Sequence, residues 1–166
     1  MDPGTQPSSF AGQWAGINRL WLSPNDPVRE SETTAAIALA ALGAFTTIRY
    51  SWAEGGKPQD GLLIVRNAAQ PGEDAMVWID SWHTGGEFMP FRGVHADDGH
   101  ISAVGAYAAP PGPDWGWRIE LAAGTGETLR ILMYNITPDG DEALAVEARY
   151  ARRSWNAGSP AGPASL

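Results

Sequence analysis

The stretch Leu144-Ala-Val-Glu-Ala-Arg-Tyr150, close to the end of the chain, shows the pattern that decides the fold. From Leu144 to Tyr150, alternate positions carry Leu, Val, Ala and Tyr, and the positions between them carry Ala, Glu and Arg. Successive side chains of a strand point to opposite faces, so this period of two predicts a strand with one buried face. The same alternation at 117–121 and 130–135 predicts two further strands.

Toward the N-terminus, turn-forming Gly, Pro and Asp recur about every 8–12 residues, a spacing that is typical of an all-β sandwich or barrel. The joints are short, which favours antiparallel pairing of consecutive strands. We therefore predict an all-β fold, a single antiparallel up-and-down β-barrel of about ten strands, because closure removes the sheet edges. The other strands are expected at 12–22, 32–42, 44–53, 61–67, 75–83, 87–93 and 101–108.

The segment 32–42 fits two interpretations. It is rich in Ala, the best helix former, and its length suits a helix of roughly three turns. A short apolar run cannot be assigned to helix or strand by its period alone, and the neighbouring segments all have strand patterns. We predict a strand here, followed by a bulge or turn at Gly43.

Length and charge limit the classes of function. The chain has 166 residues, which suits one domain with a complete core. Its net charge of −8 repels phosphate backbones and anionic lipids, so we expect no nucleic-acid partner and no membrane partner. It contains no Cys, which excludes disulfides and thiolate metal sites. We expect a cytoplasmic protein with a flexible lead at 1–9, a barrel domain at 10–153 and a flexible tail at 154–166.

The stretch 10–16, FAGQWAG, places a Gly-x-Trp sequence on the first predicted strand, and the last strand ends in two arginines. This combination resembles the calycin superfamily, in which the Trp plugs the closed end of a barrel and a basic side chain lies across it. Here that side chain would be Arg152 or Arg153. A flat guanidinium suits the face of an indole ring, so the arrangement is also physically reasonable. The expected barrel cap consists of Gly12, Trp14, Gly16 and Arg152.

More specifically, the chain is similar to the bacterial DUF1579 family. The resemblance implies a calycin-like barrel and no established chemistry. The resemblance depends on the order of the matching stretches, which extend along nearly the whole domain. These stretches are 10–16, 41–45 with 49–50, 78–81, 91–93 and 150–152.

Heme is not an expected cofactor. Related barrels, the heme-binding nitrobindins, open with Gly-x-Trp-x-Gly-x-Gly, and here Asn18 takes the place of the third Gly. The last strands, 127–153, also contain no His that could bind heme iron. We therefore expect no cofactor.

The chain contains eight Trp residues. In a small barrel such residues either fill the interior or line a cavity for one small ligand, and both interpretations stay open. Our main hypothesis is a binding protein for a small, mostly hydrophobic ligand, with Arg152 meeting a polar head group unless Trp14 engages it fully. The expected lining residues are Tyr50, Trp52, Trp78, Trp117, Met133 and Tyr150.

Asp80 and His83 are weak candidates for catalysis. Both faces of 75–83 mix apolar and polar residues, so the face that points inward is not decided. An inward Asp80 would have a raised pKa and suit acid–base work, whereas the plain alternative is an Asp hydrogen-bonded to an Arg or to backbone at the rim. His83 lies three residues further on, which on a regular strand puts it on the opposite face and counts against a direct pair. We expect no metal site, because His95 and His100 flank a predicted turn without a third ligand.

Two other functions remain open. A cofactor-independent enzyme of the isomerase or cyclase type could use an inward Asp80, Tyr150 and Arg152. A structural or oligomeric protein, such as a homodimer joined through exposed aromatic side chains like Trp21, would instead have a filled barrel.

Overall fold

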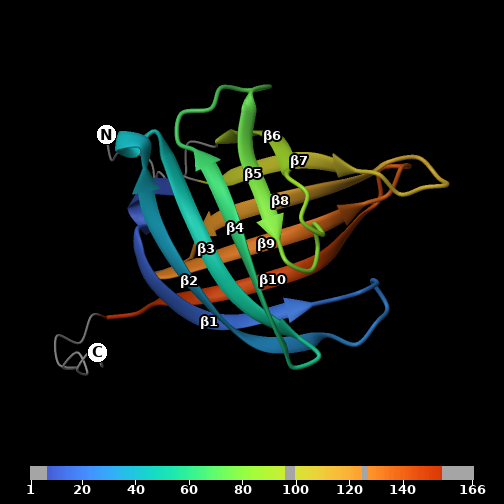
Figure 1. Ribbon diagram of the computed structural model, residues 1–166, viewed down its shortest axis with the longest axis horizontal. Helices are drawn as coiled ribbons and strands as arrows, with labels where there is room; N and C mark the ends of the chain where they lie inside the picture. Colours follow the sequence, from blue (N-terminus) through green and yellow to red (C-terminus); the bar gives the residue numbers. More distant parts are fainter. Residues whose placement is uncertain (1–6, 96–99, 125–126, 155–166) are drawn as a thin grey trace, which may run out of the picture.

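A computed structural model describes residues 7–95, 100–124 and 127–154 of the chain. Each strand pairs antiparallel with the next one along the chain, and β1 closes the sheet against β10 (Figure 1). The predicted all-β, up-and-down barrel is thus confirmed. The strands are β1 (Gly12–Leu20), β2 (Arg29–Ala40), β3 (Phe45–Glu54), β4 (Lys57–Arg66), β5 (Asp74–Asp80), β6 (Met89–His95), β7 (Ile101–Tyr107), β8 (Trp115–Ala123), β9 (Thr128–Ile136) and β10 (Glu142–Arg152).

The described part of the chain has two short 3-10 turns, η1 (Pro7–Phe10) and η2 (Ala41–Gly43), and no helix that is long and apolar enough to cross a membrane. Of the predicted lead and tail, residues 1–6 and 155–166 lie outside the described residues. The turn between His95 and His100 does as well.

The Ala-rich segment is strand β2, so the helix interpretation is wrong. Ala35 pairs with Trp14 of β1 on one side and with Tyr50 of β3 on the other. Ala is small enough to lie beneath these two large inward side chains, and this packing overrides its helix propensity. The strand ends at η2, where Gly43 has a positive φ of 88°.

Two strand bounds differ from the prediction in ways that matter for the site. β4 begins at Lys57, earlier than expected, because the Gly55-Gly56 pair makes a tight hairpin after Glu54. β5 ends at Asp80 rather than at His83. The backbone turns directly after Asp80, so the period-two rule no longer describes the residues that follow.

One end of the barrel is closed by Trp14, which is 2% exposed. The guanidinium carbon of Arg152 lies 4.3 Å from the centroid of its ring, and the Trp14 Nε1 donates to the carbonyl oxygen of Phe10 at 2.8 Å. Arg152 also donates to the carbonyl oxygens of Ala11 and Ser9, at 2.6 and 3.2 Å. Arg152 rather than Arg153 is the residue that lies across the indole.

The two glycines that flank Trp14 allow this close packing. A Cβ at Gly12, where φ is +138°, would lie 2.6 Å from an Arg152 nitrogen. A Cβ at Gly16 would overlap the carbonyl oxygen of Arg149 on the neighbouring strand β10. Glycine is therefore required at Gly16 for the first and last strands to meet, and at Gly12 it is favoured by the positive φ.

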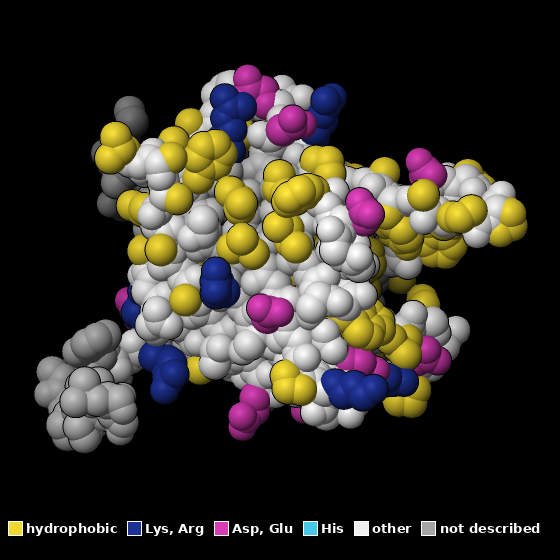
Figure 2. Space-filling model, in the orientation of Figure 1, with side chains coloured by type: hydrophobic (Ala, Val, Ile, Leu, Met, Phe, Trp, Pro, Cys, Tyr) yellow, Lys and Arg dark blue, Asp and Glu magenta, His cyan; other side chains and the backbone are white. Residues whose placement is uncertain are grey.

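The opposite end of the barrel is surrounded by the loops that follow β1, β3, β5, β7 and β9, toward the right of Figure 1. Figure 2 shows hydrophobic side chains on both sides of a notch beneath the projecting β7–β8 hairpin. We call this the open end. Its most exposed aromatic side chain is Phe88, which is 77% exposed.

Candidate functional site

Asp80, the last residue of β5, is the centre of a buried hydrogen-bond network behind the open end. Its side chain is fully buried. Oδ2 accepts hydrogen bonds from the Tyr50 hydroxyl at 2.7 Å and from Trp52 Nε1 at 3.1 Å. Oδ1 accepts from the backbone N–H groups of Trp82 and His83, at 2.9 and 2.8 Å. The turn that ends β5 thus supplies donors to the carboxylate and allows a charge to be buried there.

The network continues deeper into the barrel through Tyr50. The Trp78 Nε1 donates to the Tyr50 oxygen at 2.7 Å, and that hydroxyl in turn donates to Asp80. Thr84 holds the turn itself, because its hydroxyl accepts from the Asp80 backbone N–H and donates to the Asp80 carbonyl oxygen, each at 3.0 Å. Two strands and one turn are therefore fixed around a single carboxylate.

Burial alone would raise the pKa of Asp80, as the sequence analysis expected for an inward Asp. The hydrogen bond of His83, the positive charge that its ring carries when protonated, and the hydrogen bonds from the His83 backbone and Tyr50 outweigh burial and lower the pKa of Asp80 to about 2. Asp80 is thus a carboxylate at neutral pH. The expectation of a raised pKa is wrong because it counted desolvation without the donors in the turn. For Tyr50, burial and the Asp80 charge raise the pKa well above 10.

His83 contacts Asp80 directly, contrary to the geometry expected from a regular strand. Its Nδ1 lies 3.1 Å from Asp80 Oδ1. The contact is possible because β5 ends at Asp80, and the turn then brings the His83 ring back over the carboxylate. An ionised carboxylate only accepts hydrogen bonds, so in the neutral imidazole the proton lies on Nδ1 and Nε2 carries the free lone pair.

Aromatic rings surround His83 on several sides. The centroid of its ring lies 5.2 Å from those of Trp52 and Trp78, 4.7 Å from that of Trp82 and 5.7 Å from that of Trp117. Trp78 and Trp117 stack on each other with centroids 5.6 Å apart and planes 13° from parallel. These ring contacts enclose the imidazole and favour one orientation of it.

Two buried polar atoms in this group have no hydrogen-bond partner among the described residues, namely His83 Nε2 and Trp117 Nε1. Buried polar atoms of proteins are almost always hydrogen-bonded, so each unpartnered atom requires an explanation. One is an acceptor in the neutral imidazole and the other is a donor. They belong to neighbouring rings, whose centroids lie 5.7 Å apart.

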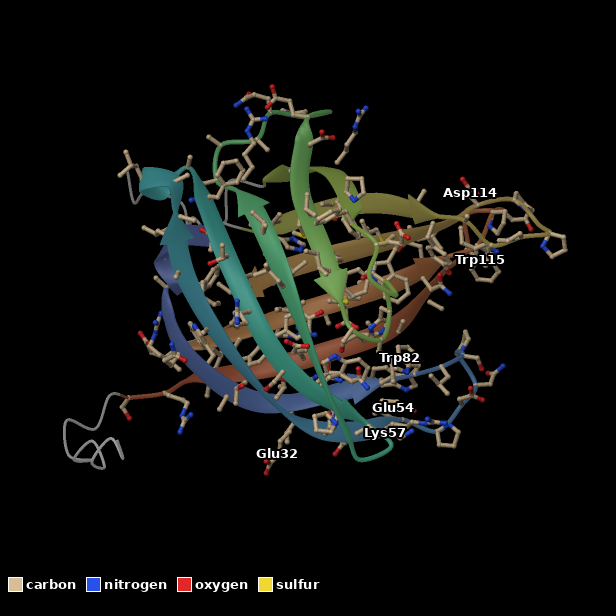
Figure 3. All side chains as sticks on the ribbon, viewed as in Figure 1. Glu32, Glu54, Lys57, Trp82, Asp114 and Trp115 are labelled. Carbon is tan, nitrogen blue, oxygen red and sulfur yellow. The ribbon has the colours of Figure 1, made fainter. Side chains whose placement is uncertain are left out.

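A pocket of about 530 Å³ opens beside these rings at the open end of the barrel. We call it the mouth pocket. It lies between the turn 81–88 on one side and strands β7 and β8 on the other. Figure 3 shows Trp82 at this end, between the Glu54–Lys57 hairpin below it and Trp115 above it in the view. The walls are Trp78, Trp82, His83, Thr84, Glu87, Phe88, Met89, Ala106, Tyr107, Ala108 and Trp117.

The residues expected to bind a ligand fall in three places. Trp78 and Trp117 line the mouth pocket. Arg152 lies at the closed end over Trp14, on the far side of the barrel. The remaining residues surround an inner cavity of only about 20 Å³, close to the size of one water molecule, so the interior itself is nearly filled. The residues of this third group are Tyr50, Trp52, Met133 and Tyr150.

Tyr150 is occupied within the barrel. The Thr33 hydroxyl donates to the Ser51 carbonyl oxygen at 2.7 Å, so the Tyr150 hydroxyl, 3.0 Å away, donates to Thr33. Burial raises the pKa of Tyr150 to about 12. Tyr150 lines the inner cavity together with Asp80 and His83, whereas Arg152 lies at the closed end over Trp14.

The part of the mouth pocket that loops provide was not predicted from the sequence. Trp82 and Phe88 come from the turn between β5 and β6, a segment that we had divided between two strands. The Gly85-Gly86 pair within this segment indicated a turn, but it did not indicate that the turn would form a wall of the mouth pocket. Trp21, expected on a dimer face, is only half-exposed.

The outer wall carries a second, larger depression of about 890 Å³ over β1, β9 and β10. Its charged groups are already paired, since Glu147 forms ion pairs with Arg19, Arg130 and Arg149. No group of three His, Asp or Glu side chains that could hold a metal ion occurs in the described ranges. The mouth pocket is thus the place where aromatic walls and unpartnered polar atoms meet.

Comparison with known proteins supports the fold. The model of a family described as "Protein of unknown function (DUF1579)" matches residues 8–152. The crystal structure of Rv2717c from M. tuberculosis has a TM-score of 0.57 at 16% identity, covering 89% of this chain and 94% of that one. The S-type phycobiliprotein lyase CPES from Guillardia theta has a TM-score of 0.53 at 12% identity, covering 87% and 88%. No curated protein matches the chain.

Proposed function

The chain belongs to the DUF1579 family, which has no assigned function, and from the geometry of its open end we propose that it is a binding protein for a small, mostly hydrophobic ligand. The mouth pocket, rather than the interior of the barrel, is the proposed binding place. Its volume of about 530 Å³ suits a small molecule. The observation that carries the proposal is that aromatic rings at the back and rim of this pocket surround two buried polar atoms without partners.

Exposure of the rim supports this proposal. Phe88 and Trp82 are 77% and 41% exposed at the edge of the mouth pocket. Large apolar side chains gathered beside a concave surface are typical of ligand sites, because a ligand covers them when it binds. The neighbouring Phe91 and Trp78 are fully buried, so the pocket has a rigid floor beneath an exposed rim.

Titration with the uncharged dye Nile red tests the proposal. We expect its fluorescence to rise on binding to the wild type, and Phe88→Ser to weaken the binding severalfold because the rim loses apolar area. Leu42→Ser is the matched control, since Leu42 is also an exposed apolar side chain but lies in η2 at the closed end. Equal binding by all three proteins, or no binding to the wild type, would contradict a ligand site at the open end.

The Asp80–His83 contact favours a second candidate function, a cofactor-independent enzyme that moves a proton. Asp80 orients His83 and fixes its tautomer, which leaves Nε2 as the base. Of the three residues first considered for such chemistry, Asp80 is the one whose side chain contacts a residue of the mouth pocket, namely His83. Tyr150 and Arg152 have other partners.

Nitrobenzisoxazole, a flat hydrophobic probe for a general base, tests this candidate. His83 Nε2 would take its ring C–H proton while the N–O bond breaks and a cyanonitrophenolate leaves, and the proton would then pass from His83 to solvent. We expect the wild type to exceed His83→Phe by on the order of a hundredfold if His83 is an accessible base. Equal rates for the wild type and His83→Phe would contradict the enzyme function and leave only the binding function.

A further inference from the structure

We propose that the mouth pocket recognises an uncharged aromatic alcohol, whose hydroxyl group donates a hydrogen bond to His83 Nε2 and accepts one from Trp117 Nε1. This inference rests on the proposed function, because it names the chemical class of ligand that the same pocket takes. It concerns the polar group of that ligand, whereas the proposed function concerns only its hydrophobic body.

The two hydrogen-bonding roles follow from the site. His83 Nδ1 faces the Asp80 carboxylate at 3.1 Å, so the neutral ring presents an acceptor at Nε2. Trp117 Nε1 is an N–H group and can only donate. Both atoms are buried, and neither has a partner among the residues that the structure describes. A group that satisfies both must donate one hydrogen bond and accept another, as a hydroxyl does.

The charged groups around the pocket disfavour an anionic head group. None of the described residues that line the mouth pocket is Lys or Arg, whereas Glu87 borders it and the Asp80 carboxylate lies behind His83. A carboxylate ligand would meet these negative charges without a counter-ion. It would also find no donor at Nε2 of a neutral His83. The two hydroxyl groups in the pocket walls are already engaged, because Tyr107 donates to Asn135 at 2.7 Å and Thr84 exchanges hydrogen bonds with the Asp80 backbone at 3.0 Å.

The rings around the two atoms favour an aromatic body. Trp78 and Trp117 present stacked planes at the back of the pocket, and Trp82 lies edge-on against His83. A flat ring can stack on these surfaces while its hydroxyl reaches the polar pair. Trp82, which is 41% exposed, contacts the His83 ring on the solvent side of this group.

Calorimetric titration with four matched naphthalenes tests the inference. β-Naphthol can donate and accept, its methyl ether can only accept, naphthalene can do neither, and β-naphthoate carries a negative charge. We expect wild-type protein at neutral pH to bind β-naphthol about tenfold more tightly than naphthalene, the effect of two modest net hydrogen bonds, and severalfold more tightly than the ether, which cannot donate to His83. β-Naphthoate is expected to bind more weakly than β-naphthol.

Variants locate the preference within the pocket. His83→Phe keeps a ring of similar size and is expected to abolish the preference for β-naphthol over naphthalene. Trp117→Phe is expected to reduce it severalfold. Trp115→Phe is the matched control, because Trp115 lies on the same strand, two residues before Trp117, and does not line the mouth pocket. If a variant fails to fold, the comparison of the four compounds on the wild-type protein still tests the inference.

The possible results distinguish a failure of this inference from a failure of the proposed binding function. Equal binding of naphthalene, the ether and β-naphthol would overturn the inference and leave the hydrophobic binding function intact, with a buried water satisfying the polar pair. Tightest binding of β-naphthoate, or a preference that persists in both His83→Phe and Trp117→Phe, would also overturn it. If none of the four compounds binds, the proposed function fails as well.

Discussion

Asp80 Oδ1 and His83 Nδ1 lie 3.1 Å apart, although His83 is the third residue after Asp80 and a continuous strand would place them on opposite faces. The turn after β5 makes this contact possible. It thereby also creates the hydrogen-bond network around Asp80, behind the mouth pocket. One carboxylate there fixes the tautomer of an imidazole and also holds Tyr50 and Trp52.

The pH dependence of stability should report on Asp80. Its pKa in the folded protein, about 2, is lower than its ordinary value of 3.8. A lowered carboxyl pKa contributes stability that is complete above about pH 4 and is lost as the pH falls toward 2, here about 2 kcal/mol. Urea unfolding should therefore show Asp80→Asn to be less stable than wild type at pH 7, with a smaller difference at pH 2. Asp60→Asn, at an exposed carboxylate, is the control, and a difference that does not change with pH would contradict the account.

The Tyr50 hydroxyl should be a stabilising link in the network. Tyr50→Phe leaves Trp78 Nε1 without its acceptor and removes a donor from Asp80 Oδ2, at a cost of about 1–3 kcal/mol in the free energy of unfolding. Tyr134→Phe is the control, because the Tyr134 ring packs beneath Arg118 on the outer wall, with 4.1 Å from the guanidinium carbon to the ring centroid. Denaturant titration that finds equal stability for the two variants would rule out the link.

At the closed end, Arg152→Met should destabilise the barrel. The change removes the cation over Trp14 and the hydrogen bonds to the carbonyl oxygens of Ala11 and Ser9, together worth about 1–3 kcal/mol. Arg153→Met, at the exposed neighbouring position, should stay within about 0.5 kcal/mol of the wild type. Thermal unfolding of the two variants compares them directly, and an equal loss would show that Arg152 has no special part in the cap.

Closure of the barrel should depend on Gly16. A methyl group there overlaps the Arg149 carbonyl oxygen, so Gly16→Ala must push β1 away from β10. We expect a loss of at least about 2 kcal/mol, or failure to fold, since the barrel would gain two open edges. Gly112→Ala, where the added Cβ meets nothing nearer than 3.5 Å, should be close to neutral. Wild-type stability of Gly16→Ala would contradict the close approach of the two strands.

The period of two was enough to predict the barrel, because inward and outward side chains alternate on every strand. For the segment 32–42, the strand patterns on both sides of it decided correctly against its Ala-rich composition. The residues of the cap were also visible, since Gly12, Trp14 and Gly16 form a spaced motif on the first strand. These features depend on local pattern and on the requirement that the strands close.

The site behind the open end could not be predicted in the same way. Alternation fails where a strand ends, and the end of β5 at Asp80 has no clear sequence signal before the Gly85-Gly86 pair. The pKa of Asp80 depends on donors from the turn and from β3, which are far apart in the sequence. The mouth pocket depends on how the loops lie over the barrel, and this is set by tertiary packing rather than by residue pattern.

The indole N–H resonances of the Trp residues in ¹⁵N-labelled protein test the central claim most directly, because they report on both ends of the barrel in one titration. On addition of β-naphthol, the account predicts that the resonances of Trp78, Trp82 and Trp117 shift and saturate together, while that of Trp14 stays in place. Assignment by single Trp→Phe variants identifies each signal. Shifts centred on Trp14, or no saturable shift at any indole, would contradict a ligand site at the open end of the barrel.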